Sequence, residues 1–223
     1  MKIVIGYDPI ESEAAYVLQH SIMRHASITP EFILLNKQNL RGIYKRERGP
    51  LESTEFSITR FLTPYLCHYE GYAIFMDCDM ICRDDIAKLW AWRDDRYSVR
   101  VVKHDHVPQE EKKFLDQIQT SYAFKNWSSV MLFNNEKCKN LTPEYINTAA
   151  GLDLHQFKWT EKDLIGDLPS HWNHLADVEK PDRNASLVHW TLGGPYFEAY
   201  RNAEHHCEYW TNRTLMLSIK KDK

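Results

Sequence analysis

Two carboxylates, Asp77 and Asp79, stand one residue apart directly after the apolar run at 72–76. Side chains two residues apart on a strand point to the same face of a sheet, so both carboxylates can converge on one ion. At a separation of about 4 Å and an effective dielectric of about 20, two such charges repel by about 4 kcal/mol. A bound Mg²⁺ or Mn²⁺ would remove that repulsion, although Asp is also common in turns that follow strands. The spacing therefore predicts a divalent cation site, with a simple turn as the alternative.

A histidine, His189, precedes a glycine-rich loop in the segment VHWTLGGP (188–195). The backbone of Gly193 and Gly194 can approach a ligand closely and offer N–H groups to phosphate. An imidazole added to two carboxylates suits Mn²⁺ better than Ca²⁺. A histidine at the end of a short strand is also often a packed core residue, and this alternative stays open.

The elements that would position these residues alternate between strands and helices. Apolar and β-branched runs predict strands over 2–8, 32–36, 72–79, 97–104, 129–135 and 186–190. Helical spacing and capping residues predict helices over 10–25, 54–69, 84–92 and 197–210, with loops at 41–50 and 168–175. The alternation favours an α/β sandwich with a mainly parallel central sheet. Ligands sit at the carboxyl ends of strands in such sheets, where Asp8, Asp77 and Asp79 fall.

Composition narrows the class of protein. The chain has 223 residues, of which 43% are hydrophobic and 26% charged, as expected for one globular domain over residues 1–223. A formal net charge of −3 gives no excess of positive charge of the kind that binds nucleic acid or an anionic membrane. No apolar run approaches the roughly 18 residues of a membrane span, and we expect no signal peptide, because Asp8 interrupts the first apolar run. The five cysteines are odd in number and scattered, which predicts free thiols in a reducing cytoplasm.

Six segments resemble, in the same order, those of a GT-A nucleotide-sugar glycosyltransferase, in a pattern close to glycosyltransferase family 8. They are IGYD (5–8), TRFLTPYL (59–66), FMDCDMIC (75–82), NWSSVMLFNN (126–135), LPSHWNHL (168–175) and VHWTLGGPY (188–196). The resemblance covers nearly the whole chain and implies a GT-A (Rossmann-like) α/β/α sandwich. It also implies a hexosyltransferase-like, retaining enzyme that moves a sugar from a UDP-sugar donor to a saccharide acceptor of the glycan or lipopolysaccharide type.

The resemblance implies roles for individual residues. Asp77, Asp79 and His189 would bind the metal, Mn²⁺ or Mg²⁺. The nucleotide sugar would contact Tyr7, Asp8, Asp77, Cys78, Asp79, Ser128, Ser129, Gly193 and Gly194, with Tyr7 and Asp8 at the uracil or ribose. The expected catalytic residues are Arg60, Glu161 and Asp163. Arg60 would fix the donor sugar or an adjacent carboxylate.

The sequence departs from the family pattern at two places. The segment before Leu-Pro reads TEKDLIGD, with Lys162 where the family has an amide, so Glu161 or Asp163 is the carboxylate that would face the sugar. The family's lysine after the histidine and glycine loop has no counterpart. Lys103 and Lys125 are therefore the candidates to neutralise the diphosphate.

Three other stretches are rich in aromatic or histidine residues. Trp172 lies in a polar loop and is expected to line the acceptor cleft. The stretch KHDHVP (103–108) could bind a metal through His104 and His106, but a solvated loop is the favoured interpretation. The stretch HHCEYW (205–210) has no zinc-ligand spacing and is expected to form a helix surface.

Two other functions stay open at the level of sequence. A nucleotidyltransferase also aligns phosphates on paired carboxylates, but this chain has no strongly basic stretch for a triphosphate. A non-catalytic module that binds nucleotide sugars would keep the same site without turnover.

Overall fold

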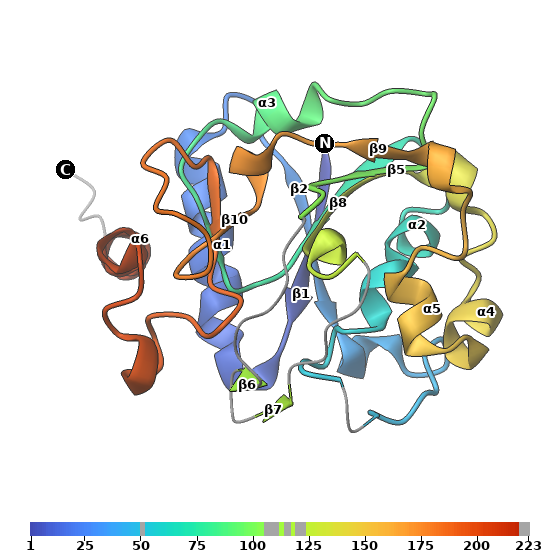
Figure 1. The fold of residues 1–223 in the computed structure, drawn as a ribbon, viewed down its shortest axis with the longest axis horizontal. Coiled ribbons are helices and arrows are strands. Elements are labelled where there is room, and N and C mark those ends of the chain that lie inside the picture. The colour runs from blue at the N-terminus through green and yellow to red at the C-terminus, as the bar shows by residue number, and fades with distance from the viewer. Residues whose placement is uncertain (50–51, 105–111, 114–116, 119–123, 219–223) are drawn as a thin grey trace.

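A six-stranded sheet forms the centre of the molecule (Figure 1). The computed structural model describes residues 1–49, 52–104, 112–113, 117–118 and 124–218. In sheet order the strands are β2 (Glu31–Asn36), β1 (Lys2–Tyr7), β3 (Tyr72–Met76), β8 (Val130–Asn134), β5 (Val99–Val101) and β9 (Ile165–Asp167). Strand β8 runs antiparallel to β3 and β5, and the other neighbours pair in parallel. The predicted mainly parallel sheet is confirmed.

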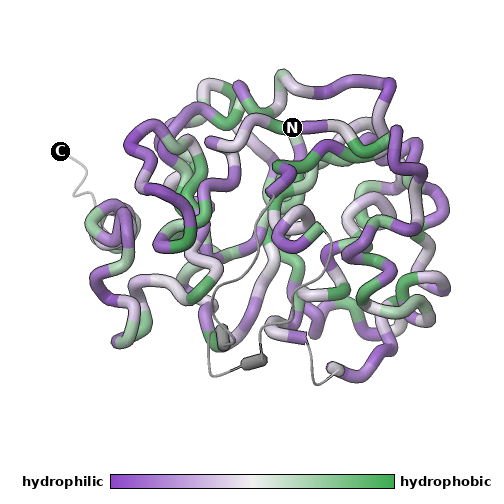
Figure 2. Tube along the Cα trace, in the orientation of Figure 1, coloured by the Kyte–Doolittle hydropathy of each residue, from purple (hydrophilic) through white to green (hydrophobic). Residues whose placement is uncertain are grey.

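Helices cover both faces of this sheet. On one side of it in Figure 1 lie α1 (Ser12–His25) and α6 (His206–Leu217). On the other side lie α2 (Thr63–Leu66), α4 (Pro143–Thr148) and α5 (Gly151–His155), and α3 (Ile86–Trp90) is near one end. Strands covered on both faces are apolar throughout, and Ile3, Val4 and Ile5 of β1 are fully buried. Figure 2 shows hydrophobic segments along these central strands. The predicted α/β/α sandwich is confirmed.

A second sheet has three strands, which come from the middle and the C-terminal part of the chain. Three residues separate the end of β3 from strand β4 (Met80–Cys82), which pairs antiparallel with β11 (Leu187–His189). Strand β10 (His174–Leu175) pairs in parallel with β11. A separate apolar cluster that includes Val17, Val188, Trp190 and Tyr209 packs α1 and α6 around this sheet. The sequence did not predict β4 or β10, because strands of two or three residues carry too short a pattern.

The remaining elements are short. The 3₁₀ helices are at Pro9–Glu11, Lys37–Leu40, Thr59–Leu62, Trp127–Ser129, Asn135–Cys138, Lys162–Leu164, Ser170–Trp172 and Glu198–Tyr200. The strands β6 (Lys112–Lys113) and β7 (Gln117–Ile118) pair with each other in antiparallel fashion.

Two predicted helices are partly wrong. The range 54–69, in which Pro64 predicts a kink, contains only the 3₁₀ helix at Thr59–Leu62 and the short α2. The break falls next to Pro64, which has no N–H to bond back to the preceding turn. The range 197–210 is interrupted at His205, whose φ of 61° is left-handed. A residue in that conformation cannot continue a right-handed helix, so α6 begins at the next residue and extends to Leu217.

The cysteines are free, as predicted, and four of the five are buried. Within the part of the chain that the structure describes, no helix combines the length and apolarity needed to cross a bilayer.

Candidate functional site

Asp77, Asp79 and His189 come together where the two sheets meet. Each offers one ligand atom, and these atoms lie within 4.8 Å of one another. Nε2 of His189 is 3.4 Å from Oδ1 of Asp79 and 4.0 Å from Oδ2 of Asp77. The pairing of β11 with β4 places His189 opposite Met80, the residue after Asp79. The small sheet therefore brings the imidazole to the carboxylates from more than a hundred residues away in the sequence.

Asn173 orients the ring of His189. Nδ1 of His189 lies 3.0 Å from Oδ1 of Asn173, so the amide oxygen accepts a hydrogen bond from Nδ1–H and Nε2 faces the carboxylates. The amide nitrogen of Asn173 donates to the backbone oxygen of Asn126 at 3.2 Å and to Nε2 of His104 at 3.0 Å. An imidazole whose second nitrogen is fixed in this way is typical of metal ligands. Sequence reasoning singled out Trp172 in this loop and gave its neighbour Asn173 no role.

Arg60 neutralises part of the negative charge at the site. Its Nη1 is 2.8 Å from Oδ1 of Asp77 and donates to the backbone oxygen of Ser128 at 2.9 Å. The guanidinium carbon lies 5.3 and 5.2 Å from the ring centroids of Phe56 and Phe75. Of the two partners expected for Arg60, the structure shows the adjacent carboxylate, which is Asp77.

A third carboxylate, Glu11, lies close to the pair. The hydroxyl of Tyr196 donates to Oε2 of Glu11 at 2.6 Å. Burial, followed by the negative charge of Asp79, raises the pKa of Glu11 to about 8. Sequence reasoning missed Glu11, because an acid at the start of a predicted helix is ordinary as a favourable charge near a helix N-terminus.

The donor set fits a divalent cation. Oδ1 of Asp79 is buried and makes no hydrogen bond to any described residue. Two carboxylates and an imidazole are donors that suit Mn²⁺, and Mg²⁺ is held by carboxylates in many proteins. A cation there would give Asp79 a partner and would offset the negative charge that Arg60 leaves. The residues present therefore fit the ion that the resemblance implies.

The cluster opens into a cavity of about 370 Å³. Its walls include Glu11, Arg46, Arg60, Asp77, Asp79, Asn126, Ser128, Ser129, His155, His189, Thr191 and Gly193. The hydroxyl of Ser128 lies 2.9 Å from Nδ1 of His155. Sequence reasoning gave no role to two further cavity residues, His155 and Asn126. His155 lies outside the quoted segments, and in the segment 126–135 only Ser128 and Ser129 were assigned to the donor.

The predicted glycine loop is held close to two tyrosines. A Cβ atom on Gly193 would overlap the ring of Tyr200, and one on Gly194 would overlap the ring of Tyr196. Gly193 lines the cavity, whereas Gly194 does not. Cys78 is fully buried, so its side chain packs in the core and does not face the cavity.

Tyr7 and Asp8 lie apart from the main cavity. Tyr7 lines a second cavity together with Asn36, Lys37 and Tyr44, at the carboxyl ends of β1 and β2. Asp8 is 2% exposed, and its two carboxylate oxygens accept hydrogen bonds from the backbone N–H groups of Ile10 and Glu55, each at 2.9 Å. Asp8 therefore shapes the turn after β1.

Several predicted residues are not brought to the main cavity. Glu161 and Asp163 are exposed and do not line it. Lys103 forms a surface ion pair with Asp167 at 3.0 Å. Lys125 is buried but is also absent from the cavity walls. The basic residues that do line the cavity are Arg46 and Arg60.

Three interpretations of aromatic and histidine residues need correction. Trp172 is 1% exposed, so it belongs to the core and cannot line an acceptor cleft. His104 is buried rather than solvated, because Asn173 and Glu179 hold both of its ring nitrogens. His106 lies outside the described residues. His205 does not form part of an exposed helix surface, because it lies beside Glu204 before α6 begins.

Known proteins resemble the chain in sequence and in fold. No family model matches it. Protein CDI of Arabidopsis thaliana is 44% identical over 220 residues, which are 95% of this chain and 85% of that protein.

Solved glycosyltransferases share the fold at low identity. The bifunctional glycosyltransferase WbbM gives a TM-score of 0.67 at 12% identity, over 96% of this chain but only 49% of its own. The galactosyltransferase LgtC gives 0.64 at 14% identity, over 99% of this chain and 98% of its own. The glycosyltransferase GlyE of Streptococcus pneumoniae gives 0.64 at 13% identity, over 97% of this chain and 61% of its own. The fold is thus of the GT-A type, and the chain belongs to the same protein family as Protein CDI of Arabidopsis thaliana.

Proposed function

We propose that the protein is a metal-dependent glycosyltransferase that moves a sugar from a UDP-sugar to a saccharide acceptor. The observation that carries the proposal is the cluster of Asp77, Asp79 and His189, which lies beyond the carboxyl end of β3 on the wall of the main cavity. Ligands bind at this end of the strands in open α/β sheets. Proteins with the same fold are described as glycosyltransferases, and LgtC was crystallised with donor and acceptor sugar analogues.

In this proposal Asp77, Asp79 and His189 hold Mn²⁺ or Mg²⁺. When bound, such an ion supplies a Lewis acid that stabilises the negative charge of a departing diphosphate. Arg60 fixes the position of Asp77 through their ion pair. Asn173 fixes the ring of His189 so that Nε2 stays directed at the carboxylates.

The neutral polar residues of the cavity would bind the donor sugar. Ser128 and His155 hydrogen-bond to each other, and Asn126 and Ser129 line the same wall. Hydroxyl, imidazole and amide groups form hydrogen bonds with the hydroxyl groups of a hexose without adding charge. Fixed dipoles around the sugar also stabilise charge that develops during transfer. We extend the proposal to retention of the anomeric configuration, on the resemblance of the motifs alone.

The second cavity would bind the uracil or the ribose. Tyr7 and Tyr44 offer aromatic rings there, and Asn36 and Gln38 offer amide groups. Stacking on a ring and hydrogen bonds to amides are the usual contacts of a nucleobase. Asp8 would act indirectly, because its oxygens already hold the turn beside Tyr7.

Two broader assignments belong to the same proposal. We treat residues 1–223 as one domain, because β4 continues directly from β3 and α1 contacts both sheets. The buried free cysteines support a reducing compartment such as the cytoplasm.

The test is a screen of UDP-sugars and GDP-sugars for slow hydrolysis, which needs no acceptor. We expect one UDP-sugar to be hydrolysed in the presence of Mn²⁺ and to be stable in EDTA, with the first sugar product in the donor's anomeric form by NMR. UDP binding without turnover of any donor would favour a non-catalytic module. Release of pyrophosphate from a nucleoside triphosphate and a sugar phosphate would favour a nucleotidyltransferase.

A further inference from the structure

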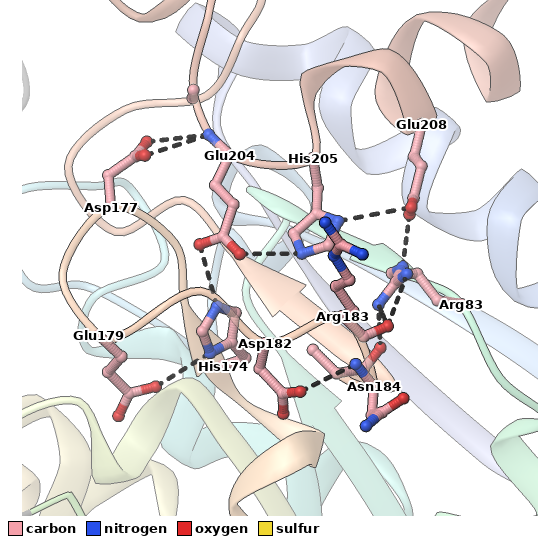
Figure 3. A network of polar contacts seen from close by, with 12 residues as sticks. Arg83, His174, Asp177, Glu179, Asp182, Arg183, Asn184, Glu204, His205 and Glu208 are labelled. Atoms are coloured by element: carbon pink, nitrogen blue, oxygen red, sulfur yellow. Dashed lines mark hydrogen bonds and ion pairs between the residues drawn. The ribbon is translucent and has the colours of Figure 1, made fainter.

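Two imidazoles flank one carboxylate, Glu204, outside the main cavity (Figure 3). Nε2 of His174, in β10, lies 3.1 Å from Oε2 of Glu204. Nε2 of His205, just before α6, lies 3.1 Å from Oε1 of the same carboxylate. One ligand atom from each of the three residues can be chosen so that all lie within 4.8 Å of one another. The cluster therefore has the spacing of a metal site.

The outer nitrogen of each ring faces another carboxylate. Nδ1 of His174 is 3.3 Å from Oε2 of Glu179, and Nδ1 of His205 is 3.4 Å from Oε1 of Glu208. Both rings thus direct Nε2 inward and Nδ1 outward, as Figure 3 shows. Histidines that bind metals almost always donate their other N–H to a carboxylate, a carbonyl or water. The arrangement matches that pattern twice.

The charges of the cluster call for a cation. Each ring has a carboxylate oxygen within 3.4 Å of both of its nitrogens. Nε2 of His205 is buried and makes no hydrogen bond of normal geometry to a described residue. Three glutamates surround the rings, and Arg83 contacts the outermost of them, Glu208, at 2.6 Å. One divalent ion between the rings would offset part of this negative charge.

The ligands are held in place before any ion binds. The backbone N–H of Glu204 donates to both oxygens of Asp177, at 3.1 and 3.2 Å. The backbone oxygen of Glu204 accepts from Nε1 of Trp190 at 2.7 Å. The side chains of His174 and His205 are 4% and 11% exposed. Such fixed surroundings lower the entropic cost of binding.

We propose that His174, Glu204 and His205 bind one divalent ion of the zinc class, in addition to the ion proposed at Asp77, Asp79 and His189. Two histidines and one glutamate form a known zinc ligand set, and bond lengths of about 2.0–2.2 Å imply neighbouring ligand atoms about 3.3 Å apart in a tetrahedron. Each imidazole has one contact of 3.1 Å, close to that value, to a different oxygen of Glu204, so the carboxylate would offer both oxygens to the ion. The ion would tie the start of α6 to β10.

A chain of hydrogen bonds joins the two sites. Glu179 faces His174 with one oxygen and lies 3.1 Å from Nδ1 of His104 with the other. His104 then contacts Asn173, which holds the ring of His189. The proposed ion would therefore help to fix the hydrogen-bonded residues that orient His189 in the cavity site. Its binding does not depend on the proposed transferase function.

The test uses the full chain with Asp79→Asn, so that the cavity site lacks one ligand. After treatment with EDTA, this protein is titrated with Co²⁺, whose visible absorption reports four- or five-coordinate binding, and then with Zn²⁺. We expect one equivalent of Co²⁺ to bind, Zn²⁺ to displace it, and Zn²⁺ to raise the Tm. Adding Glu204→Gln keeps the volume of the side chain but removes a charged ligand. Co²⁺ binding should weaken by at least about 100-fold, because even the loss of a residue that hydrogen-bonds to a metal ligand lowers affinity by up to about 100-fold.

The matched control is His206→Gln. Nε2 of His206 lies 3.3 Å from Sγ of the exposed Cys207. This pair follows His205 in the sequence and could bind a metal ion adventitiously. We expect His206→Gln to leave Co²⁺ binding unchanged. Circular dichroism checks the fold, and His205→Gln replaces Glu204→Gln if the latter does not fold. The proposal is overturned if the parent binds no Co²⁺, if the ligand variants bind it as tightly as the parent, or if His206→Gln alone abolishes binding.

Discussion

Arg60 and Asp77 form a buried ion pair, with Nη1 2.8 Å from Oδ1 and side chains that are 6% and 11% exposed. Asp79 has no such cationic partner, since its buried Oδ1 makes no hydrogen bond to any described residue and its contact with His189 is 3.4 Å long. The two aspartates are therefore not equivalent, although the sequence presents them as a symmetrical pair. Part of their mutual repulsion is already offset by Arg60.

The first prediction separates the two aspartates by stability. Asp77→Asn leaves the Arg60 charge buried without its carboxylate, which should destabilise the metal-free protein by about 3 kcal/mol. Asp79→Asn removes a negative charge from beside Asp77 and Glu11, so stability should change by no more than about 1 kcal/mol. Urea unfolding in EDTA measures both values. Equal losses for the two variants would contradict the asymmetry.

The same two variants test the metal. Both should lose Mn²⁺ binding and donor turnover, because each removes a charged ligand. His189→Ala should also weaken Mn²⁺ binding, without any gain in stability. A fully active Asp79→Asn protein would show that the aspartates only form a turn, in which Asn serves equally well, and would remove the basis for the proposed function.

Arg60→Lys is expected to impair both folding and metal binding. An ammonium cannot reproduce the planar fork, which contacts Asp77 and the backbone of Ser128 while lying between the rings of Phe56 and Phe75. We expect a loss of about 2 kcal/mol in the free energy of unfolding and weaker Mn²⁺ binding. The control is Arg96→Lys, because the ion pair of Arg96 with Asp94 is on the surface. This variant should change the free energy of unfolding by less than about 0.5 kcal/mol. Wild-type stability and Mn²⁺ affinity in Arg60→Lys would show that the fork is dispensable.

The main strands and the residues of the candidate metal site could be predicted from the sequence, because both depend on local pattern. Short apolar runs identify β1, β2, β3 and β8, which are five or six residues long. The two carboxylates follow directly from the end of β3. The glycine-rich loop at 193–195 then indicated His189, and the resemblance of the ordered segments implied the same residue. Each of these signals is contained within a short window of the chain.

Residues whose roles depend on tertiary packing could not be predicted in the same way. Glu11 and Asn173 acquire their roles only because the 3₁₀ helix before α1 and the small sheet bring them to Asp79 and His189. Trp172 was placed in a cleft because its neighbours are polar, whereas the 3₁₀ turn at Ser170–Trp172 directs the indole into the core. Sequence spacing does not report such directions.

UDP should raise the Tm only when Mn²⁺ or Mg²⁺ is present. The basic residues that line the main cavity already have partners, since Arg60 contacts Asp77 and Nη1 of Arg46 donates to the backbone oxygen of Ala149 at 2.6 Å. A diphosphate must then depend on the ion for its neutralisation. At 100 times its Kd, UDP with Mn²⁺ should raise the Tm by about 5–10 °C. An equal shift in EDTA would count against this dependence.

Glu11 should make the metal-free protein less stable as the pH rises. Its pKa is raised from 4.5 to about 8, so the folded protein keeps a proton that the unfolded chain has lost in this interval. The stabilisation is complete below pH 4.5 and is lost as the pH rises towards 8, with a slope of at most about 1.4 kcal/mol per pH unit. Glu11→Gln does not titrate, so urea unfolding between pH 5 and 8 should show a flatter profile. Identical profiles would mean that Glu11 has an ordinary pKa.

Asn173→Ala should weaken metal binding through His189 without removing a ligand. The Asn173 carbonyl fixes Nδ1–H of His189, and without it the ring can rotate or change tautomer, so that Nε2 no longer faces the carboxylates. Loss of such an outer partner typically lowers metal affinity by about 10–100-fold. The matched control is Asn135→Ala, another fully buried asparagine, whose amide donates to the backbone oxygen of Glu70. Both variants should lose about 1–3 kcal/mol of stability, but Asn173→Ala alone should show the weaker Mn²⁺ binding. Equal Mn²⁺ affinities in the two variants would mean that packing around His189, rather than the amide, sets the direction of its ring.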